Sequence, residues 1–239
     1  MEREAEWLLR DKYDGVETPE YHKDLERLAA GEPLAYTIGW TPFLNTKIFL
    51  DSRPLIPRPE TEYWVGNAIA EAEKNSKPLK ILDLCAGSGC IGVAVLKALP
   101  NSTVDFIEID PAHHPLIAKN IRENSIDESR TRILGGDLFE NAGTGYDLIL
   151  SNPPYIDPAL QRTDGSVLNH EPHLALFGGE RGMEIIERII ADGPAHLALG
   201  GTLYIEHEPE QAEAIAKLLP GSVQLKDQFG LIRVTRYKK

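Results

Sequence analysis

The chain has 239 residues, of which 42% are hydrophobic and 26% charged, as expected for a globular protein with a substantial core. No run of about 18 apolar residues occurs, so we expect no membrane-spanning helix. The formal net charge of −12 argues against direct binding to nucleic acid and favours a protein or a small molecule as partner.

The N-terminal part is predicted to be helical, in residues 1–33. Apolar residues recur there at helical spacing until Gly31–Pro33 interrupts the pattern. A β-hairpin is expected in residues 37–50, and a proline-rich linker completes a segment that covers residues 34–59. The two prolines of LIPRPETE (55–62) require an extended backbone, so the next helix is expected to begin near Thr61.

Residues 60–239 are predicted to form the main domain. From residue 80, short apolar runs alternate with amphipathic helices, which predicts an α/β fold with a doubly wound, mostly parallel seven-stranded sheet and helices on both faces. The last two strands are close enough in sequence to form a hairpin, so we expect one antiparallel strand at that edge. The predicted strands are 80–84, 104–109, 132–134, 147–151, 201–206, 223–226 and 232–236, and the predicted helices are 90–99, 111–124, 182–199 and 209–219.

A glycine-rich turn follows the first strand of the main domain, in ILDLCAGSGCIG (81–92). Gly87 and Gly89 permit a tight turn and a close approach of a ligand, and the following helix presents free N–H groups. Glu108 ends the next strand, where a carboxylate can bind both ribose hydroxyls of an adenosine. The alternatives are a tight turn without a ligand, or a nicotinamide dehydrogenase, because GSGCIG also matches the dinucleotide fingerprint.

Two aspartates bear on the choice of cofactor. Asp83 precedes the turn and can bind a cationic amino acid portion, directly or through water, whereas it would repel a pyrophosphate. This favours S-adenosylmethionine over a dinucleotide. Asp137, after the third strand, can accept a hydrogen bond from an adenine amino group, although an ordinary loop aspartate explains it as well.

The segment DLILSNPPY (147–155) carries the strongest functional signal. Its strand lies beside the first strand in a doubly wound sheet, so its carboxyl end opens onto the cofactor crevice. The side-chain carbonyl of Asn152 and the backbone carbonyl of Pro153 can accept both hydrogens of an –NH2 group, and Tyr155 can stack on the planar group that carries it. Such acceptors localise the nitrogen lone pair and stabilise the positive charge that develops during methyl transfer. The alternative is a proline-rich surface turn.

Other chemistries have weaker support. His170 and His173 flank Glu171-Pro172, and a loop role is favoured over metal ligation, so no metal site is predicted. Cys85 and Cys90 are too few for a disulfide framework, and the acidic N-terminus lacks an apolar signal core, so we expect a cytoplasmic protein.

The motifs together resemble the HemK/PrmC family of peptide-chain release factor glutamine methyltransferases. The resemblance runs from about Tyr36 to the C-terminus. It rests on LIPRPETE (55–62), LDLCAGSG (82–89), GDLF (136–139), ILSNPPYI (149–156), HEPHLALFGGERG (170–182) and KDQFGLIRV (226–234).

The resemblance implies a class I, Rossmann-like methyltransferase that uses S-adenosylmethionine to methylate the glutamine of a Gly-Gly-Gln tip in a release factor. Family members usually have a larger N-terminal helical domain that grips the release factor, whereas about 33 residues precede the hairpin region here. The implied cofactor residues are Asp83, Cys85, Ala86, Gly87, Ser88, Gly89, Glu108, Asp137, Leu138 and Asn152. The implied substrate residues are Arg58, Pro59, Glu60, Asn152, Pro153, Pro154, Tyr155 and Glu171, with Asn152, Pro153 and Tyr155 as the catalytic set.

Two other functions remain open from sequence. The Asn-Pro-Pro-Tyr turn also occurs in amino-methyltransferases that act on adenine or guanine in nucleic acid. A cofactor-binding module without catalysis, or a dehydrogenase, is the alternative from a different class.

Overall fold

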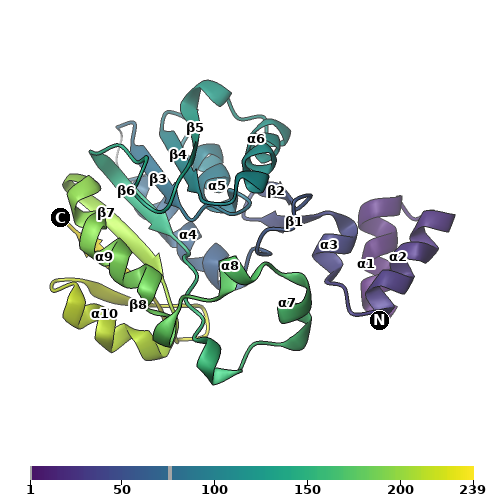
Figure 1. The fold of residues 1–239 in the computed structure, drawn as a ribbon. Coiled ribbons are helices and arrows are strands. Elements are labelled where there is room, and N and C mark those ends of the chain that lie inside the picture. The colour runs from purple at the N-terminus through teal and green to yellow at the C-terminus, as the bar shows by residue number, and fades with distance from the viewer. Residues whose placement is uncertain (1, 75–76) are drawn as a thin grey trace.

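The computed structural model describes residues 2–74 and 77–239 and has a seven-stranded sheet at its centre (Figure 1). The strand order is β5-β4-β3-β6-β7-β9-β8, and the five strands β3 to β7 are parallel to one another. This confirms the doubly wound α/β fold and places β6 beside β3, as predicted. The strands are β3 (Lys80–Leu84), β4 (Thr103–Glu108), β5 (Thr131–Gly135), β6 (Tyr146–Ser151), β7 (Leu197–Glu206), β8 (Val223–Lys226) and β9 (Ile232–Lys238).

The C-terminal end of the sheet differs in detail from the prediction. The β8–β9 hairpin is confirmed, but β9 inserts between β7 and β8 and is antiparallel to both. The antiparallel strand is therefore the second from the edge, and β8 occupies the edge itself. The helix before β7, predicted as residues 182–199, begins at Glu184 and ends at His196. Strand β7 follows directly from Leu197, whereas it was predicted to begin at Gly201.

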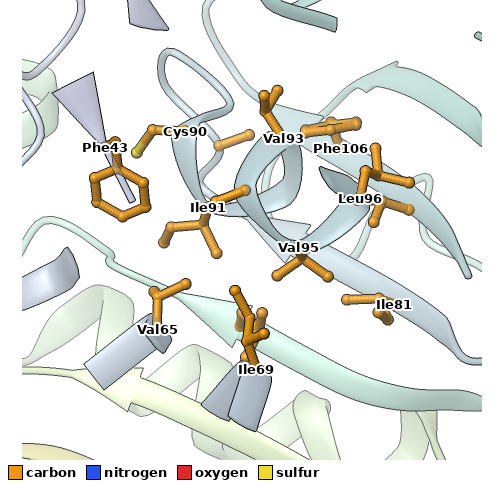
Figure 2. Close-up of a cluster of buried hydrophobic side chains, with 14 of the residues drawn as sticks. Phe43, Val65, Ile69, Ile81, Cys90, Ile91, Val93, Val95, Leu96 and Phe106 are labelled. Carbon is orange, nitrogen blue, oxygen red and sulfur yellow. The ribbon is translucent and has the colours of Figure 1, made fainter. Parts of the chain in front are cut away.

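Helices cover both faces of the sheet. One face packs against α4 (Pro59–Ala72), α5 (Cys90–Ala98) and α6 (His114–Glu123), and the other packs against α9 (Glu184–His196) and α10 (Ala212–Leu218). Successive strand residues alternate between the two cores, as strand geometry requires: Ile81 belongs to the first core and Leu82 to the second. Figure 2 shows the first core, where Val65 and Ile69 of α4 point toward the side chains of α5.

A small hairpin of β1 (Trp40–Phe43) and β2 (Thr46–Phe49) lies against α6. Asn120 and Asn124 of α6 pair with the backbone of β2 through their side-chain amides, Asn120 with Phe49 and Asn124 with Lys47. The Asn120 amide also donates to the carbonyl of Ser88. The hairpin is therefore fixed beside the glycine-rich turn.

The N-terminal helices form a separate cluster to one side of the sheet (Figure 1). They are α1 (Glu2–Tyr13), α2 (Pro19–Ala29) and α3 (Leu34–Ile38). Their small core contains Leu8, Tyr21 and Leu28, with the partly buried Leu34 and Ile38 packed against it. Helix α3 takes the first residues of the predicted 37–50 hairpin, which is therefore shorter than expected.

Short helices fill the stretches between the main elements, and most of them were not predicted. The short helices are η1 (Pro111–His113), η2 (Glu128–Arg130), η3 (Pro158–Leu160), α7 (Gly165–His170), α8 (His173–Leu176), η4 (Glu180–Gly182) and η5 (Pro209–Gln211).

Among the residues that the structure describes, no helix is both long and apolar enough to span a bilayer.

Candidate active site

Two cavities meet at the carboxyl ends of the parallel strands, where doubly wound folds bind their ligands. The first cavity contains the glycine-rich turn, and the second contains residues of the Asn-Pro-Pro-Tyr turn. Three residues line both of them: Leu55, Asn152 and Ala175. Asn152 therefore lies at the junction between the two spaces.

Most of the predicted cofactor residues gather around the first cavity. Glu108 is 7% exposed, and its two carboxylate oxygens accept hydrogen bonds from the backbone N–H groups of Gly87, at 2.7 Å, and Asp110, at 2.8 Å. A carboxylate has about four acceptor positions, so Glu108 can hold this loop and still accept from a ligand. The predicted residues that line this cavity are Cys85, Ala86, Gly87, Ser88, Glu108, Asp137, Leu138 and Asn152.

Gly89 and Asp83 lie behind the turn rather than in the cavity lining. Gly89 has a φ of +76°, precedes α5, and leaves 3.1 Å between the position of a Cβ and Ile117. Asp83 is fully buried, and its Oδ2 accepts from the Gly92 N–H at 2.8 Å, while its Oδ1 has no hydrogen-bond partner. Burial raises the pKa of Asp83 to about 8. Both residues therefore support the turn from within.

Asp137 lies at the exposed rim of the first cavity. Its Oδ2 accepts from Arg188 Nη2 at 2.8 Å, so the carboxylate bridges the rim to α9. A contact with an adenine amino group would have to share this carboxylate with Arg188.

The Asn-Pro-Pro-Tyr turn separates the two cavities. Pro153 and Tyr155 line the second cavity, and Pro154 lines the first. Because residue 154 is a proline without an N–H, the Pro153 carbonyl adjoins no donor on the next residue. The four residues of the turn are thus distributed around the point at which the cavities meet.

A buried glutamate that the sequence analysis did not select lies behind the turn. Glu206 ends β7, which is parallel to β6, so Glu206 follows in register beside Asn152. It is 1% exposed and accepts hydrogen bonds from Thr61 Oγ1, Trp64 Nε1 and the Tyr155 hydroxyl. Burial raises the pKa of Glu206, and these three donors oppose the rise. The sequence signal that could have identified Glu206 is its position at the end of a predicted strand, because the strand that leads into the turn ends at the same edge of the sheet.

The same network reaches the Asn152 side chain. Thr61 Oγ1 lies 2.7 Å from Glu206 and accepts from Asn152 Nδ2 at 3.1 Å. The Tyr155 hydroxyl donates to Glu206 at 3.0 Å, and burial followed by the Glu206 charge raises the pKa of Tyr155 well above its ordinary value. The Tyr155 hydroxyl therefore stays protonated, and its hydrogen bond to Glu206 holds the ring in position.

The remaining predicted substrate residues occupy different places. Arg58 and Glu60 line the second cavity. Glu171 is buried and accepts from Arg58 Nη2, at 2.7 Å, and from the Ile56 N–H, at 3.0 Å, so it joins two of the sequence motifs. Pro59 is exposed at the first turn of α4 and is absent from the lining of either cavity.

The histidines near this region make ordinary structural contacts. The rings of His170 and His173 donate to the backbone carbonyls of Ser166 and Leu168. Within residues 2–74 and 77–239, no group of three or more His, Cys, Asp or Glu side chains could hold a metal ion.

Solved structures share this architecture. A methyltransferase from Pyrococcus furiosus aligns with a TM-score of 0.59 and 15% identity over 91% of this chain and 98% of that chain. The protein SMU.776, solved in complex with SAH, aligns with a TM-score of 0.55 and 13% identity over 81% of this chain and 53% of that chain. At these identities the similarity shows the fold, a class I methyltransferase fold.

Sequence comparison is more specific. Residues 67–169 match the methyltransferase small domain family. The ribosomal protein uL3 glutamine methyltransferase of Bradyrhizobium diazoefficiens is 32% identical over 76% of this chain and 59% of its own length. The release factor glutamine methyltransferase of Lactococcus lactis is 36% identical over 87% of this chain and 76% of its own length. With that identity over most of both chains, this chain belongs to the release factor glutamine methyltransferase family.

Proposed function

We propose that the protein transfers a methyl group from S-adenosylmethionine to the side-chain amide nitrogen of the glutamine in a Gly-Gly-Gln segment of a peptide-chain release factor. The observation that carries this proposal is the position of Asn152 at the junction of two cavities, one suited to the cofactor and one to a peptide. We place the reaction in the cytoplasm, where release factors act.

The first cavity fits the cofactor. It combines a nearly buried acceptor, Glu108, with apolar side chains that include Ile109 and Leu138. A carboxylate matches two ribose hydroxyls, and apolar walls match a flat base, so Glu108 would hold the ribose and Ile109 and Leu138 would cover the adenine. When bound, S-adenosylmethionine supplies an electrophilic methyl group on a sulfonium.

The second cavity fits a polar peptide. Arg58, Glu60, Arg162, Glu208 and Arg233 give it charges of both signs. The Asn152 side-chain carbonyl and the Pro153 backbone carbonyl would accept the two hydrogens of the glutamine amide.

The bound amide would be activated by its acceptors. An amide nitrogen is a poor nucleophile because its lone pair is delocalised into the carbonyl group. Acceptors outside the amide plane favour a pyramidal nitrogen and stabilise the positive charge that develops on it. Asn152 and Pro153 also fix the direction of approach, which lowers the entropic cost of the reaction. The Tyr155 ring would pack on the amide plane.

The alternatives from the sequence fare differently. The dehydrogenase and the non-catalytic module are set aside, because the family is one of methyltransferases. A nucleic-acid substrate is disfavoured by the formal charge of −12. A glutamine in ribosomal protein uL3 is a second candidate substrate, since one relative is named for that activity.

The decisive experiment incubates the protein with isotopically labelled S-adenosylmethionine and a full-length release factor. Mass spectrometry should find one added methyl on the glutamine of Gly-Gly-Gln, and none in a release factor with Gly-Gly-Ala. Ribosomal protein uL3 and total RNA serve as parallel substrates. Label in uL3 or RNA, with none in any release factor, would reject the proposed substrate.

A further inference from the structure

The orientation of the Asn152 side-chain amide decides which chemical group of a substrate this residue can bind. Its oxygen and its nitrogen have similar shapes, and only one of them suits each class of substrate. A side-chain oxygen that faces the cavity accepts from an NH2 group, whereas a nitrogen there would donate to a carboxylate. The hydrogen-bond network behind the residue decides between the two.

The direction of each hydrogen bond follows from the donors available. The Trp64 indole can only donate, so Glu206 Oε2, at 2.7 Å from Trp64 Nε1, is an acceptor. The same oxygen lies 2.7 Å from Thr61 Oγ1, which therefore donates its single proton to it. Thr61 can then only accept from Asn152, so Nδ2 faces Thr61 at 3.1 Å and Oδ1 faces away from it.

The direction does not depend on whether Glu206 is charged. A proton on Glu206 belongs on Oε1, where the Tyr155 hydroxyl lies at 3.0 Å and can accept it. Oε2 then still accepts from both Thr61 and Trp64. The bond between Thr61 and Asn152 keeps its direction in both forms.

We propose that Glu206 and Thr61 are positioning residues that lock the Asn152 amide with its oxygen toward the cavities and so select a substrate that presents NH2 over one that presents a carboxylate. The inference rests on the proposed contact between Asn152 and the substrate amide. Glutamate in place of the glutamine would bring a carboxylate oxygen against the Asn152 oxygen and the Pro153 carbonyl. Neither of these groups can donate to it, and unpaired buried polar groups give strong discrimination.

The test compares variants that keep about the same side-chain volume in the network but change its hydrogen-bond donors and acceptors. Thr61→Val has nearly the same volume and no hydroxyl, so the Asn152 amide is free to turn. Thr61→Ser retains the hydroxyl. Glu206→Met has a similar volume and removes the acceptor from Thr61, so the Thr61 hydroxyl is free to donate to the Asn152 oxygen. Thr46→Val makes the same change at a buried threonine of the hairpin, which donates to the Phe43 carbonyl.

Two measurements report on the proposal: kcat with a Gly-Gly-Gln release factor, and the ratio of its binding constant to that of a Gly-Gly-Glu release factor. Thr61→Val and Glu206→Met should each lower kcat by about 10-fold to 100-fold, with little change in affinity for S-adenosylhomocysteine. Both should reduce the discrimination against Gly-Gly-Glu by about 10-fold, because a turned amide can donate to the carboxylate. Thr61→Ser and Thr46→Val should resemble the wild type in both respects.

The proposal is overturned if Thr61→Val and Glu206→Met, or whichever of them folds, keep the wild-type discrimination, or if they change only the thermal stability. A readout without substrate separates this from a failure of the proposed function. In the NMR spectrum, the Asn152 side-chain NH2 should exchange with solvent slowly in the wild type and faster in Thr61→Val. Slow exchange together with an inactive wild type would reject the substrate and keep the network, and equal exchange in both would reject the network.

Discussion

At the scale of single residues, Asn152 has the most direct role in the proposed chemistry. We predict that Asn152→Ala lowers kcat by about 100-fold or more, because one preorganised group that stabilises developing charge contributes this much in enzymes. Its affinity for S-adenosylhomocysteine should change little, since the other lining residues of the first cavity remain. Single-turnover methylation and calorimetry measure the two effects. Asn45→Ala, in the exposed hairpin turn, is the control. A normal kcat in Asn152→Ala would show that another group holds the amide.

Asp83 gives a prediction of pH dependence. Its pKa is about 8 in the folded protein, against about 4 for an exposed aspartate. The unfolded state therefore loses a proton that the folded state retains, and stability falls as pH rises from about 4 to about 8. Asp83→Asn removes this titration but keeps an acceptor for Gly92. The variant should gain stability relative to the wild type by up to about 1.4 kcal/mol per pH unit across that range. Urea unfolding at pH 5 to 9 measures this, and a difference that is constant with pH would contradict the assignment.

At the scale of elements, Gly178 and Gly182 allow their segment to pack closely against the Asn-Pro-Pro-Tyr turn. Gly182 has a φ of +66°, and a Cβ there would lie 1.9 Å from the Tyr155 carbonyl oxygen and 2.6 Å from Gln211 Nε2. Gln211 Nε2 itself donates to the Tyr155 carbonyl at 2.8 Å. This close approach gives a structural reason for the glycines in the motif HEPHLALFGGERG.

We predict that Gly182→Ala costs about 2–4 kcal/mol of stability and displaces Tyr155, because backbone strain and overpacking add. Gly221→Ala is the matched control: its φ is +86°, but nothing lies within 4 Å of the added Cβ. The control should lose only about 1–2 kcal/mol and keep its kcat. Thermal unfolding and methylation assays compare the two. Equal losses of activity in both variants would rule out the steric explanation.

The sequence predicted the elements better than the contacts between them. Hydrophobic periodicity located the parallel strands, because a strand buried on both faces has a continuous apolar run. It did not reveal that β9 inserts beside β7, since a hairpin has the same local pattern in either order. Glu206 was within a predicted strand, yet its partners Thr61 and Trp64 are more than 140 residues away in the chain. Local pattern carries no information about such contacts.

At the scale of the whole molecule, the N-terminal helices form a unit with its own core. Leu8 is fully buried, and α1 to α3 lie apart from the sheet (Figure 1). Two ion pairs link the helices of the unit through the buried Asp24 carboxylate, which accepts from Lys12, at 2.6 Å, and from Arg27, at 2.6 Å. Neither of the two cavities of the candidate active site is lined by residues of these helices. The unit therefore lies outside both cavities, and we propose that it contacts the protein substrate.

We predict that Leu8→Ala, which removes a central side chain of a three-residue core, costs the N-terminal unit about 2–5 kcal/mol and melts it. Affinity for S-adenosylhomocysteine and methylation of a short Gly-Gly-Gln peptide should remain near wild type, because the sheet and both cavities are intact. Methylation of the full-length release factor should lose kcat/KM through a higher KM, because only the large substrate reaches the N-terminal helices. Leu218→Ala, at a half-exposed site on α10, is the control. If the peptide and the full-length protein lose activity equally, these helices support the catalytic fold instead of recognising the partner.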